Sequence, residues 1–212
     1  MSPLHRGVCF LLSYMLLSSS SSRAAVEPEG SSGGASSNSS DYFLYFAYGS
    51  NLLRERLVLR NPSATFFTVG YLQNYTLQFG YWSNSLQAIG WHGGVASIQQ
   101  RGAEEVWGVV WRMRRDNLQT LDDQEGVQEG AYMPLEVNVT TAEGDTLCRT
   151  YKMNHFHPYL PSPPYKQVVC LGARQNGLPL DYIHKLEAVE TNGYKGPSIL
   201  DDIEGIGENR RE

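Results

Sequence analysis

Residues 42–52 of this chain read YFLYFAYGSNL, and this stretch decides how the folded part begins. Its first six residues are apolar and aromatic, which is typical of a buried strand. The run stops at Gly49, where the missing side chain allows unusual backbone angles. A polar residue just after the glycine can then cap a short helix over residues 52–59. The stretch therefore predicts a strand that breaks at a glycine and leads into a helix.

A strand-rich stretch follows this opening. Segments bounded by turn residues predict strands over residues 66–72, 75–81, 95–99, 106–113, 132–140 and 146–153. Turn signals at Gln73-Asn74, near Gly102 and at Glu143-Gly144 indicate tight connections between successive strands. Residues 82–93 read as a loop. Connections of this kind favour an antiparallel sheet.

Helices are expected between and after these strands. One short helix is predicted over residues 117–124, and the last third of the chain is helical. There, Pro163 suits the first turn of a helix that Gly177 stops, and a second helix covers residues 181–190. The order of elements predicts an α+β fold: a small, mainly antiparallel β-barrel with peripheral helices. It does not resemble alternating βαβ units.

Composition narrows the classes of function. The chain has 212 residues, is 41% hydrophobic and 11% aromatic, and carries a net charge of −5. This length allows one domain with a proper core, which we assign to residues 42–194. No basic stripe is present, which argues against nucleic acid as a partner. No apolar run is long enough to span a bilayer, so the mature form is expected to have no membrane anchor.

The first residues differ from the rest of the chain. Arg6 precedes an apolar run, and small residues end at Ala24-Ala25, which is the layout of a secretory signal peptide over residues 1–24. The alternative is an unstructured leader that has no targeting function. Residues 25–41 read as a flexible linker, and residues 195–212 as an acidic, disordered tail.

The cysteines and glycosylation sequons fit either the secretory pathway or the cytosol. Cys148 and Cys170 are too few for a disulfide scaffold; they could pair, but two buried free thiols are the favoured interpretation. Acceptor sequons begin at Asn38, Asn74 and Asn138, and they matter only if the chain enters the secretory pathway.

The loop after the first strand is the first candidate site. A strand that breaks at glycine leaves backbone N–H groups unpaired, and these can hold a carboxylate or stabilise an oxyanion. A plain strand-to-helix turn is the competing interpretation, and the pattern alone favours it. The spacing and the lysine of a P-loop are absent. The candidate residues are Tyr45, Phe46, Ala47, Tyr48, Gly49, Ser50 and Asn51.

The acidic segment Asp122-Asp123-Gln124-Glu125-Gly126 is the second candidate. Its carboxyl groups follow a short helix, where the negative end of the helix dipole and the like charges both favour protonation. A carboxyl group with a raised pKa, such as Glu125, can move protons near neutral pH. A solvated acidic turn is the competing interpretation, and an apolar pocket around Glu125 would reverse it.

Other candidates carry weaker signals. The hydroxyls of Tyr132, Tyr151 and Tyr165 could orient a polar substrate, although most tyrosines on strands simply pack. Metal and covalent chemistry are not expected. The histidines, His92, His155 and His157, lack partners at ligand spacing, the serines show no nucleophile elbow, and the cysteines have no readable histidine partner.

Several motifs, in order, resemble the γ-glutamyl cyclotransferase family of animals. They are YFAYGSNL (45–52), RNPSA (60–64), WHGG (91–94), EVWGVVW (105–111), LDDQEGV (121–127), PPYK (163–166) and Glu187 with its preceding helix. The resemblance covers roughly residues 42–194, nearly all of the folded chain. It implies a small β-barrel with peripheral helices, no cofactor and, in many members, a homodimer.

The resemblance also implies a function. Such an enzyme converts a small γ-glutamyl peptide into 5-oxoproline and a free amino acid. In that family the loop matching residues 45–50 binds the γ-glutamyl group, and the glutamate matching Glu125 is the general acid and base. The tyrosine matching Tyr165 closes on the substrate, and Tyr132 matches a pocket tyrosine.

Three questions stay open from sequence. The chain could be a non-catalytic secreted binding protein on the same scaffold, or its substrates could be γ-glutamylamines or glutathione. The leader predicts the secretory pathway, whereas the resembled family is cytosolic.

Overall fold

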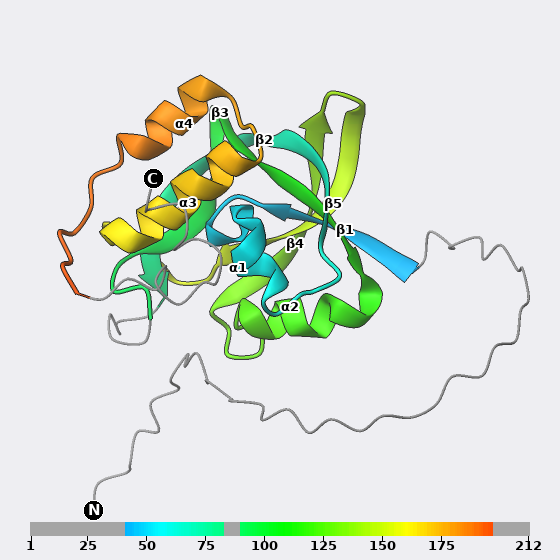
Figure 1. Ribbon diagram of the computed structural model, residues 1–212, viewed down its shortest axis with the longest axis horizontal. Coiled ribbons are helices and arrows are strands. Elements are labelled where there is room, and N and C mark those ends of the chain that lie inside the picture. The colour runs from blue at the N-terminus through cyan, green and yellow to red at the C-terminus, as the bar shows by residue number, and fades with distance from the viewer. Residues whose placement is uncertain (1–40, 83–89, 197–212) are drawn as a thin grey trace, which may run out of the picture.

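The computed structural model describes residues 41–82 and 90–196, which fold around a closed β-barrel. In this described part, the barrel wall consists of β1 (Tyr42–Ala47), β2 (Thr65–Trp82), β3 (Val95–Arg114), β4 (Tyr132–Thr141) and β5 (Gly144–Met153). The strands follow the order β3-β1-β5-β4-β2, and β2 pairs with β3 to close the ring. β1 and β5 run parallel, whereas the other neighbours are antiparallel. The expected small, mainly antiparallel barrel is confirmed (Figure 1).

The ribbon formed by β2 and β3 differs from the predicted short strands. Each strand is continuous, and the register slips between Gln73 and Tyr75, opposite residues 101–104. Asn74 lies at the slip with a left-handed φ of 65°. The chain turns at neither Asn74 nor Gly102, so the two predicted connections are wrong. Both turn signals mark a single irregularity in the ribbon, because extra residues on one strand disrupt the pairing and bend it.

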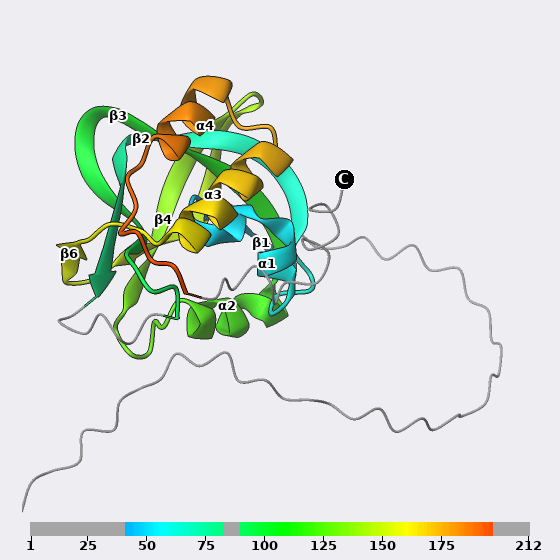
Figure 2. The same cartoon turned by 60° about the vertical axis from the view of Figure 1, so that its left-hand side comes forward.

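Short helices cover one side and one end of the barrel (Figure 2). They are η2 (Ser50–Leu52), α1 (Arg54–Val58), η4 (Arg115–Asn117), α2 (Leu118–Gln124), α3 (Pro163–Gln175) and α4 (Leu180–Glu187). The helix expected over residues 52–59 is shorter than predicted, because Leu53 has an extended backbone between η2 and α1. The helices expected near residues 117–124 and after Pro163 are confirmed. The short strand β6 (Phe156–Pro158) was not predicted, and it pairs with the end of β2.

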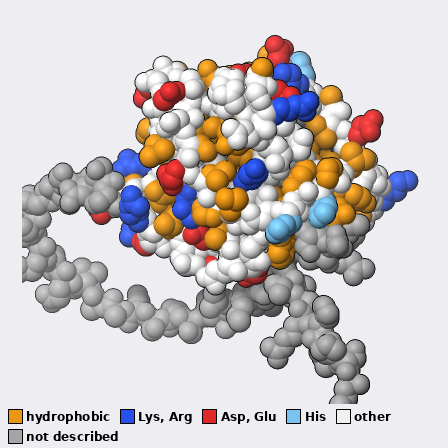
Figure 3. Space-filling model, turned by 180° about the vertical axis from the view of Figure 1, so that it is seen from behind, with side chains coloured by type: hydrophobic (Ala, Val, Ile, Leu, Met, Phe, Trp, Pro, Cys, Tyr) orange, Lys and Arg blue, Asp and Glu red, His pale blue; other side chains and the backbone are white. Residues whose placement is uncertain are grey.

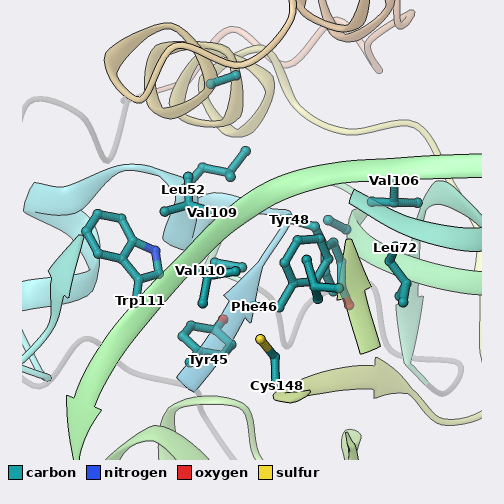
Figure 4. Close-up of a cluster of buried hydrophobic side chains, with 14 of the residues drawn as sticks. Tyr45, Phe46, Tyr48, Leu52, Leu72, Val106, Val109, Val110, Trp111 and Cys148 are labelled. Atoms are coloured by element: carbon teal, nitrogen blue, oxygen red, sulfur yellow. The ribbon is translucent and has the colours of Figure 1, made fainter. Parts of the chain in front are cut away.

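Large apolar side chains from β1 and β3 form much of the buried core. Phe46, Val110 and Trp111 are completely buried, as is Leu52 from η2. Figure 4 shows Phe46 beside Tyr48, and their ring centres are 6.4 Å apart. The burial of such side chains is the main stabilising term of the fold. Because β1 is fixed in this core, the loop that leaves it at Gly49 starts from a rigid position.

Helix α3 holds η2 from the outside. Gly172 allows this close approach, because a Cβ atom at that position would lie 2.4 Å from the Leu53 backbone nitrogen. The Asn176 side chain donates a hydrogen bond to the Leu52 carbonyl oxygen at 2.8 Å. On the other side, the Trp111 indole N–H donates to the Asn51 carbonyl oxygen at 3.1 Å. The turn after β1 is therefore clamped between the barrel and α3.

The two described cysteines are free thiols. Cys148 is buried and Cys170 is half-buried, in line with the favoured interpretation. The expected leader lies outside the described residues, as do Asn38 and almost all of the expected linker and tail. No helix within residues 41–82 and 90–196 is both long enough and apolar enough to cross a membrane.

Candidate active site

The two candidate segments, far apart in sequence, meet in the structure. The Asn51 side-chain nitrogen donates a hydrogen bond to Glu125 Oε1 at 2.9 Å. Asn51 belongs to η2, which follows the loop after β1, and Glu125 follows the last turn of α2. Gly126, with a φ of 64°, then turns the chain away. Glu125 therefore faces the glycine loop rather than the far side of the molecule.

A chain of amide hydrogen bonds sets the position of Asn51. The Asn61 side-chain nitrogen donates to Gln124 Oε1 at 3.0 Å, and the Gln124 nitrogen donates to Asn51 Oδ1 at 2.9 Å. Asn51 also donates to the Tyr45 hydroxyl oxygen at 3.0 Å. Since the Asn51 oxygen accepts from Gln124, its nitrogen must face the Tyr45 hydroxyl and the Glu125 carboxyl group.

Burial dominates the electrostatics of Glu125. It raises the pKa of Glu125 from an ordinary value of 4.5 to about 7, and the charge of Asp122 adds a smaller rise. Arg56 and the hydrogen bond from Asn51 both lower this pKa. The sequence interpretation expected a raised pKa from like charges and the helix end, whereas the structure gives burial as its largest cause. A carboxyl group with a pKa near 7 can both accept and return a proton at neutral pH.

Tyr165 lies over the glycine of the loop. Its hydroxyl oxygen accepts a hydrogen bond from the Ala96 backbone N–H at 2.9 Å, and Ser50 also bonds to it. A Cβ atom on Gly49 would lie 2.9 Å from the Ala96 Cβ and 3.1 Å from this hydroxyl. Gly49 has φ −117° and ψ −137°, outside the ordinary strand and helix regions as the sequence predicted, and the lack of space for a side chain is a second reason for glycine here.

Further aromatic groups enclose this region. The Tyr132 hydroxyl donates to the Ala96 carbonyl oxygen at 2.8 Å, so Ala96 binds Tyr132 through its C=O and Tyr165 through its N–H. Burial raises the pKa of Tyr132 and of Tyr48 well above its ordinary value, which keeps both hydroxyls neutral. Trp91 contacts the Tyr165 ring edge-on, with ring centres 5.0 Å apart. The site is thus lined mainly by neutral tyrosine hydroxyls and backbone groups.

The side chains of three predicted residues are engaged elsewhere. The Phe46 and Ala47 side chains are buried in the core. The Tyr151 hydroxyl donates to Asp122 Oδ1 at 2.5 Å, and Arg149 pairs with the same carboxylate at 2.7 Å. The Tyr151 hydroxyl is therefore engaged by an ion pair, whereas the sequence suggested that it could orient a substrate.

Arg56 and Trp91 belong to this region but were not among the site residues predicted. The positive charge of Arg56 affects the pKa of Glu125, and its guanidinium carbon lies 6.0 Å from the centre of the Trp91 ring. A lone arginine on a short helix carries no sequence pattern, whereas Trp91 stands in the WHGG motif. In Figure 1 and Figure 2, α1, which carries Arg56, lies between α3 and α2.

The described residues hold no group of three His, Cys, Asp or Glu side chains that could bind a metal ion. The His92 ring instead stacks on Tyr194, with ring centres 4.3 Å apart. On the face shown in Figure 3, Lys and Arg side chains are interspersed with acidic and apolar ones.

Comparisons with known proteins identify relatives of this chain. A model described as the AIG2-like family matches residues 105–186. Gamma-glutamylcyclotransferase of Homo sapiens is 53% identical over 168 residues, which cover 79% of this chain and 88% of the relative. The protein of the same name from Bos taurus is 51% identical with the same coverage.

Solved structures extend the likeness to three dimensions. A gamma-glutamyl cyclotransferase structure matches with a TM-score of 0.74 and 49% identity, covering 80% of this chain and 98% of that chain. YkqA from Bacillus subtilis has a TM-score of 0.59 and 22% identity, covers 74% of this chain and 58% of that chain, and is similar in fold alone. With about half of all aligned residues identical over most of each relative, the chain belongs to the γ-glutamylcyclotransferase family.

Proposed function

We propose that this protein is a γ-glutamylcyclotransferase that converts γ-glutamyl amino acids to 5-oxoproline and a free amino acid, without a cofactor. One observation carries the proposal: Glu125, with a pKa of about 7, is hydrogen-bonded to Asn51 beside the Gly49 loop. The relatives named gamma-glutamylcyclotransferase, at 51–53% identity, support the same activity.

Glu125 acts first as a general base in this proposal. The substrate's α-amino group must attack its own γ-carbonyl carbon, but an ammonium group has no lone pair. Glu125 removes one proton from it, which is feasible because the carboxyl group has a pKa near neutrality. After attack, the new C–N bond leaves a positive ring nitrogen, which gives up a second proton.

The loop and Glu125 then complete the reaction. Attack builds negative charge on the carbonyl oxygen, which the backbone N–H groups near Gly49 and Ser50 stabilise. The old γ-amide bond breaks as its nitrogen takes up the two protons lost by the ring nitrogen, with Glu125 as the carrier. The amino acid leaves as its ammonium form, so atoms and charge balance without added water.

Orientation is the second task of the site. Ring closure is intramolecular, so the enzyme gains rate by holding the flexible γ-glutamyl chain in a bent shape. The buried side chains of Tyr45 and Tyr165 have little room to move, being 5% and 3% exposed. Together with Tyr132, their neutral hydroxyls supply fixed hydrogen-bonding groups for the glutamyl part.

The test compares Glu125→Gln with Glu129→Gln, an exposed glutamate a few residues on. Wild type and Glu129→Gln should release 5-oxoproline from γ-glutamyl-alanine, whereas Glu125→Gln should lose activity by at least about 100-fold. Circular dichroism and thermal melting check that each variant is folded. Near-normal turnover by folded Glu125→Gln would remove Glu125 from the mechanism. An inactive wild type that binds the substrate would support the non-catalytic alternative.

Substrate choice is a separate part of the proposal. Glutathione and γ-glutamylamines contain the same γ-glutamyl group, so the site chemistry described above does not by itself separate them from γ-glutamyl dipeptides. Initial rates with γ-glutamyl-alanine, glutathione and a γ-glutamylamine, measured side by side, decide which is preferred.

We also propose that residues 1–24 are a signal peptide, on the sequence pattern alone. The secreted protein should then begin at Ala25 or Val26, which N-terminal sequencing would detect. Recovery of the protein in the cytosol with Met1 or Ser2 at its start would refute the leader and favour the cytosolic location.

The homodimer implied by the resemblance is likewise a proposal. Light scattering of the purified protein should give twice the mass of the chain, and the mass of a single chain would contradict it.

A further inference from the structure

The side chain of Arg56 places a positive charge beside the candidate active site. Arg56 lies on α1 and is partly buried. Among the residues that the structure describes, none forms a hydrogen bond or ion pair with its guanidinium group, whose carbon lies 6.0 Å from the centre of the Trp91 ring. A guanidinium group stays charged in proteins, and taking such a charge out of water without a partner is costly.

The neighbours of Arg56 belong to the candidate active site. Burial lowers the pKa of Arg56, and among the groups that raise it Glu125 acts most strongly, followed by Tyr165 and Tyr45. Trp91 links Arg56 to Tyr165, because it contacts both. This positive charge, which has no ion-pair partner within residues 41–82 and 90–196, therefore lies near the groups of the proposed reaction.

Glu125 does not act as the counter-ion of Arg56. No ion pair within 4.0 Å joins the two side chains, and Glu125 accepts its hydrogen bond from Asn51 instead. The pKa of Glu125 is about 7 although Arg56 is near, so this carboxyl group is partly protonated at neutral pH. The positive charge of Arg56 is thus available to an anionic group of a ligand.

The proposed substrate offers two carboxylates to Arg56, one on the glutamyl part and one on the leaving amino acid. Tyr45 and Tyr165 are almost fully buried, whereas Arg56 and Trp91 are partly exposed, as Glu125 is. The glutamyl part must lie inside, between Glu125 and the Gly49 loop, for its ring to close. The leaving amino acid then lies on the outer side, from which it departs.

We propose that Arg56 binds the α-carboxylate of the leaving amino acid and so makes the enzyme selective for γ-glutamyl amino acids over γ-glutamylamines. The inference rests on the proposed function and deepens it. Arginine is suited to this role because its planar group binds a carboxylate through two hydrogen bonds. Trp91 supports the guanidinium group through a cation–π contact.

The test uses two substrates that differ only by this carboxylate: γ-glutamyl-alanine and γ-glutamyl-ethylamide. Their kcat/KM values are measured over a pH range for wild type, Arg56→Gln, Arg56→Lys and the control Arg54→Gln. Arg54 is exposed on the same helix. Values on the pH-independent plateau are compared, because the loss of Arg56 also raises the pKa of Glu125.

Wild type should prefer γ-glutamyl-alanine by about 10- to 100-fold, the range of a charge-assisted hydrogen-bonded contact. Arg56→Gln should lose this preference by slowing γ-glutamyl-alanine alone, with less than about threefold change for the ethylamide. Arg56→Lys should retain part of the preference because it keeps the charge. Arg54→Gln should behave as wild type.

Other results overturn the inference. Equal losses on both substrates would mean that Arg56 acts through Glu125 or on the glutamyl part, which both substrates share. A wild type without preference between the substrates refutes the inference even if Arg56→Gln fails to fold. A wild type that turns over neither substrate overturns the proposed function itself, so the two failures are distinguishable.

Discussion

Asn51 donates a hydrogen bond to Glu125 at 2.9 Å, across 74 positions of sequence. The same side-chain nitrogen lies 3.0 Å from the Tyr45 hydroxyl oxygen. One amide group therefore connects Tyr45 of the first strand with the carboxyl group of Glu125, the residue that follows α2. Because Gln124 fixes the amide's oxygen, Asn51 holds Glu125 in one orientation relative to the loop.

Asn51→Ala should impair catalysis and shift its pH dependence. The hydrogen bond from Asn51 lowers the pKa of Glu125, so its loss moves this pKa above about 7. Since the base form of Glu125 is needed, the acidic limb of the kcat/KM profile should move to higher pH, with at least a tenfold loss at pH 7. The measurement is kcat/KM for γ-glutamyl-alanine between pH 5 and pH 9.

Asn176→Ala is the matched control for this variant. It also removes an amide that binds the η2 turn, but its partners are the carbonyl oxygens of Leu52 and Gly172 rather than Glu125. Its acidic limb should coincide with that of wild type. An unshifted limb in Asn51→Ala would show that the hydrogen bond does not tune Glu125.

Glu125 should also make the stability of the fold depend on pH. Its pKa is about 7 in the folded protein and near 4.5 in the unfolded chain, so the folded state binds the extra proton between these values. The free energy of unfolding must then fall as pH rises from about 4.5 to about 7. The full shift corresponds to about 3 kcal/mol.

The difference between wild type and Glu125→Gln isolates this contribution, because the other titrating groups are common to both. Urea unfolding at pH 4, 6 and 8 should show wild type losing up to about 3 kcal/mol relative to the variant. A difference that stays constant with pH would mean that Glu125 titrates normally.

Much of the fold was readable from local patterns. The apolar run of β1, the turn at Glu143-Gly144 between β4 and β5, and the prolines that begin α3 each carry their own signal. The bend of the β2–β3 ribbon was not readable, because turn residues such as Asn74 and Gly102 also suit a bulge. Only the pairing of the two strands distinguishes these outcomes.

The candidate site could be predicted from the sequence only in part, because it too depends on contacts between distant segments. The loop at Gly49 and the acid at Glu125 stand out as local motifs, but what brings them together is a set of long-range contacts through Asn51. The cause of the raised pKa of Glu125 is burial, which depends on the whole fold. Arg56 has no local sequence signature. Its proposed role depends on its having no ion-pair partner among the described residues, which only the folded structure shows.

Gly172→Ala should loosen the clamp on η2. Its Cβ would lie 2.4 Å from the Leu53 nitrogen and 2.5 Å from the Leu52 carbonyl carbon, and backbone atoms cannot rotate away. We expect a loss of about 1–3 kcal/mol of stability, as for other overpacked sites, together with reduced activity. Gly102→Ala is the control, because nothing lies within 4 Å of a Cβ there. Equal melting temperatures for the two variants would contradict the close packing of α3 on η2.

Gly49→Ala should displace the strand that carries the partner of Tyr165. The new Cβ would lie 2.9 Å from the Ala96 Cβ, which is closer than such atoms approach, and Ala96 donates the N–H that holds the Tyr165 hydroxyl. We expect at least a tenfold loss of kcat/KM, since misplacement of a binding group by a fraction of an ångström weakens orientation. Adding Ala96→Gly removes the opposing methyl group and keeps that N–H, so the double variant should regain much of the lost activity. The remaining 3.1 Å contact with the Tyr165 hydroxyl makes the recovery partial. If the double variant were no better than Gly49→Ala, the glycine would be required for a reason other than the space that Ala96 leaves.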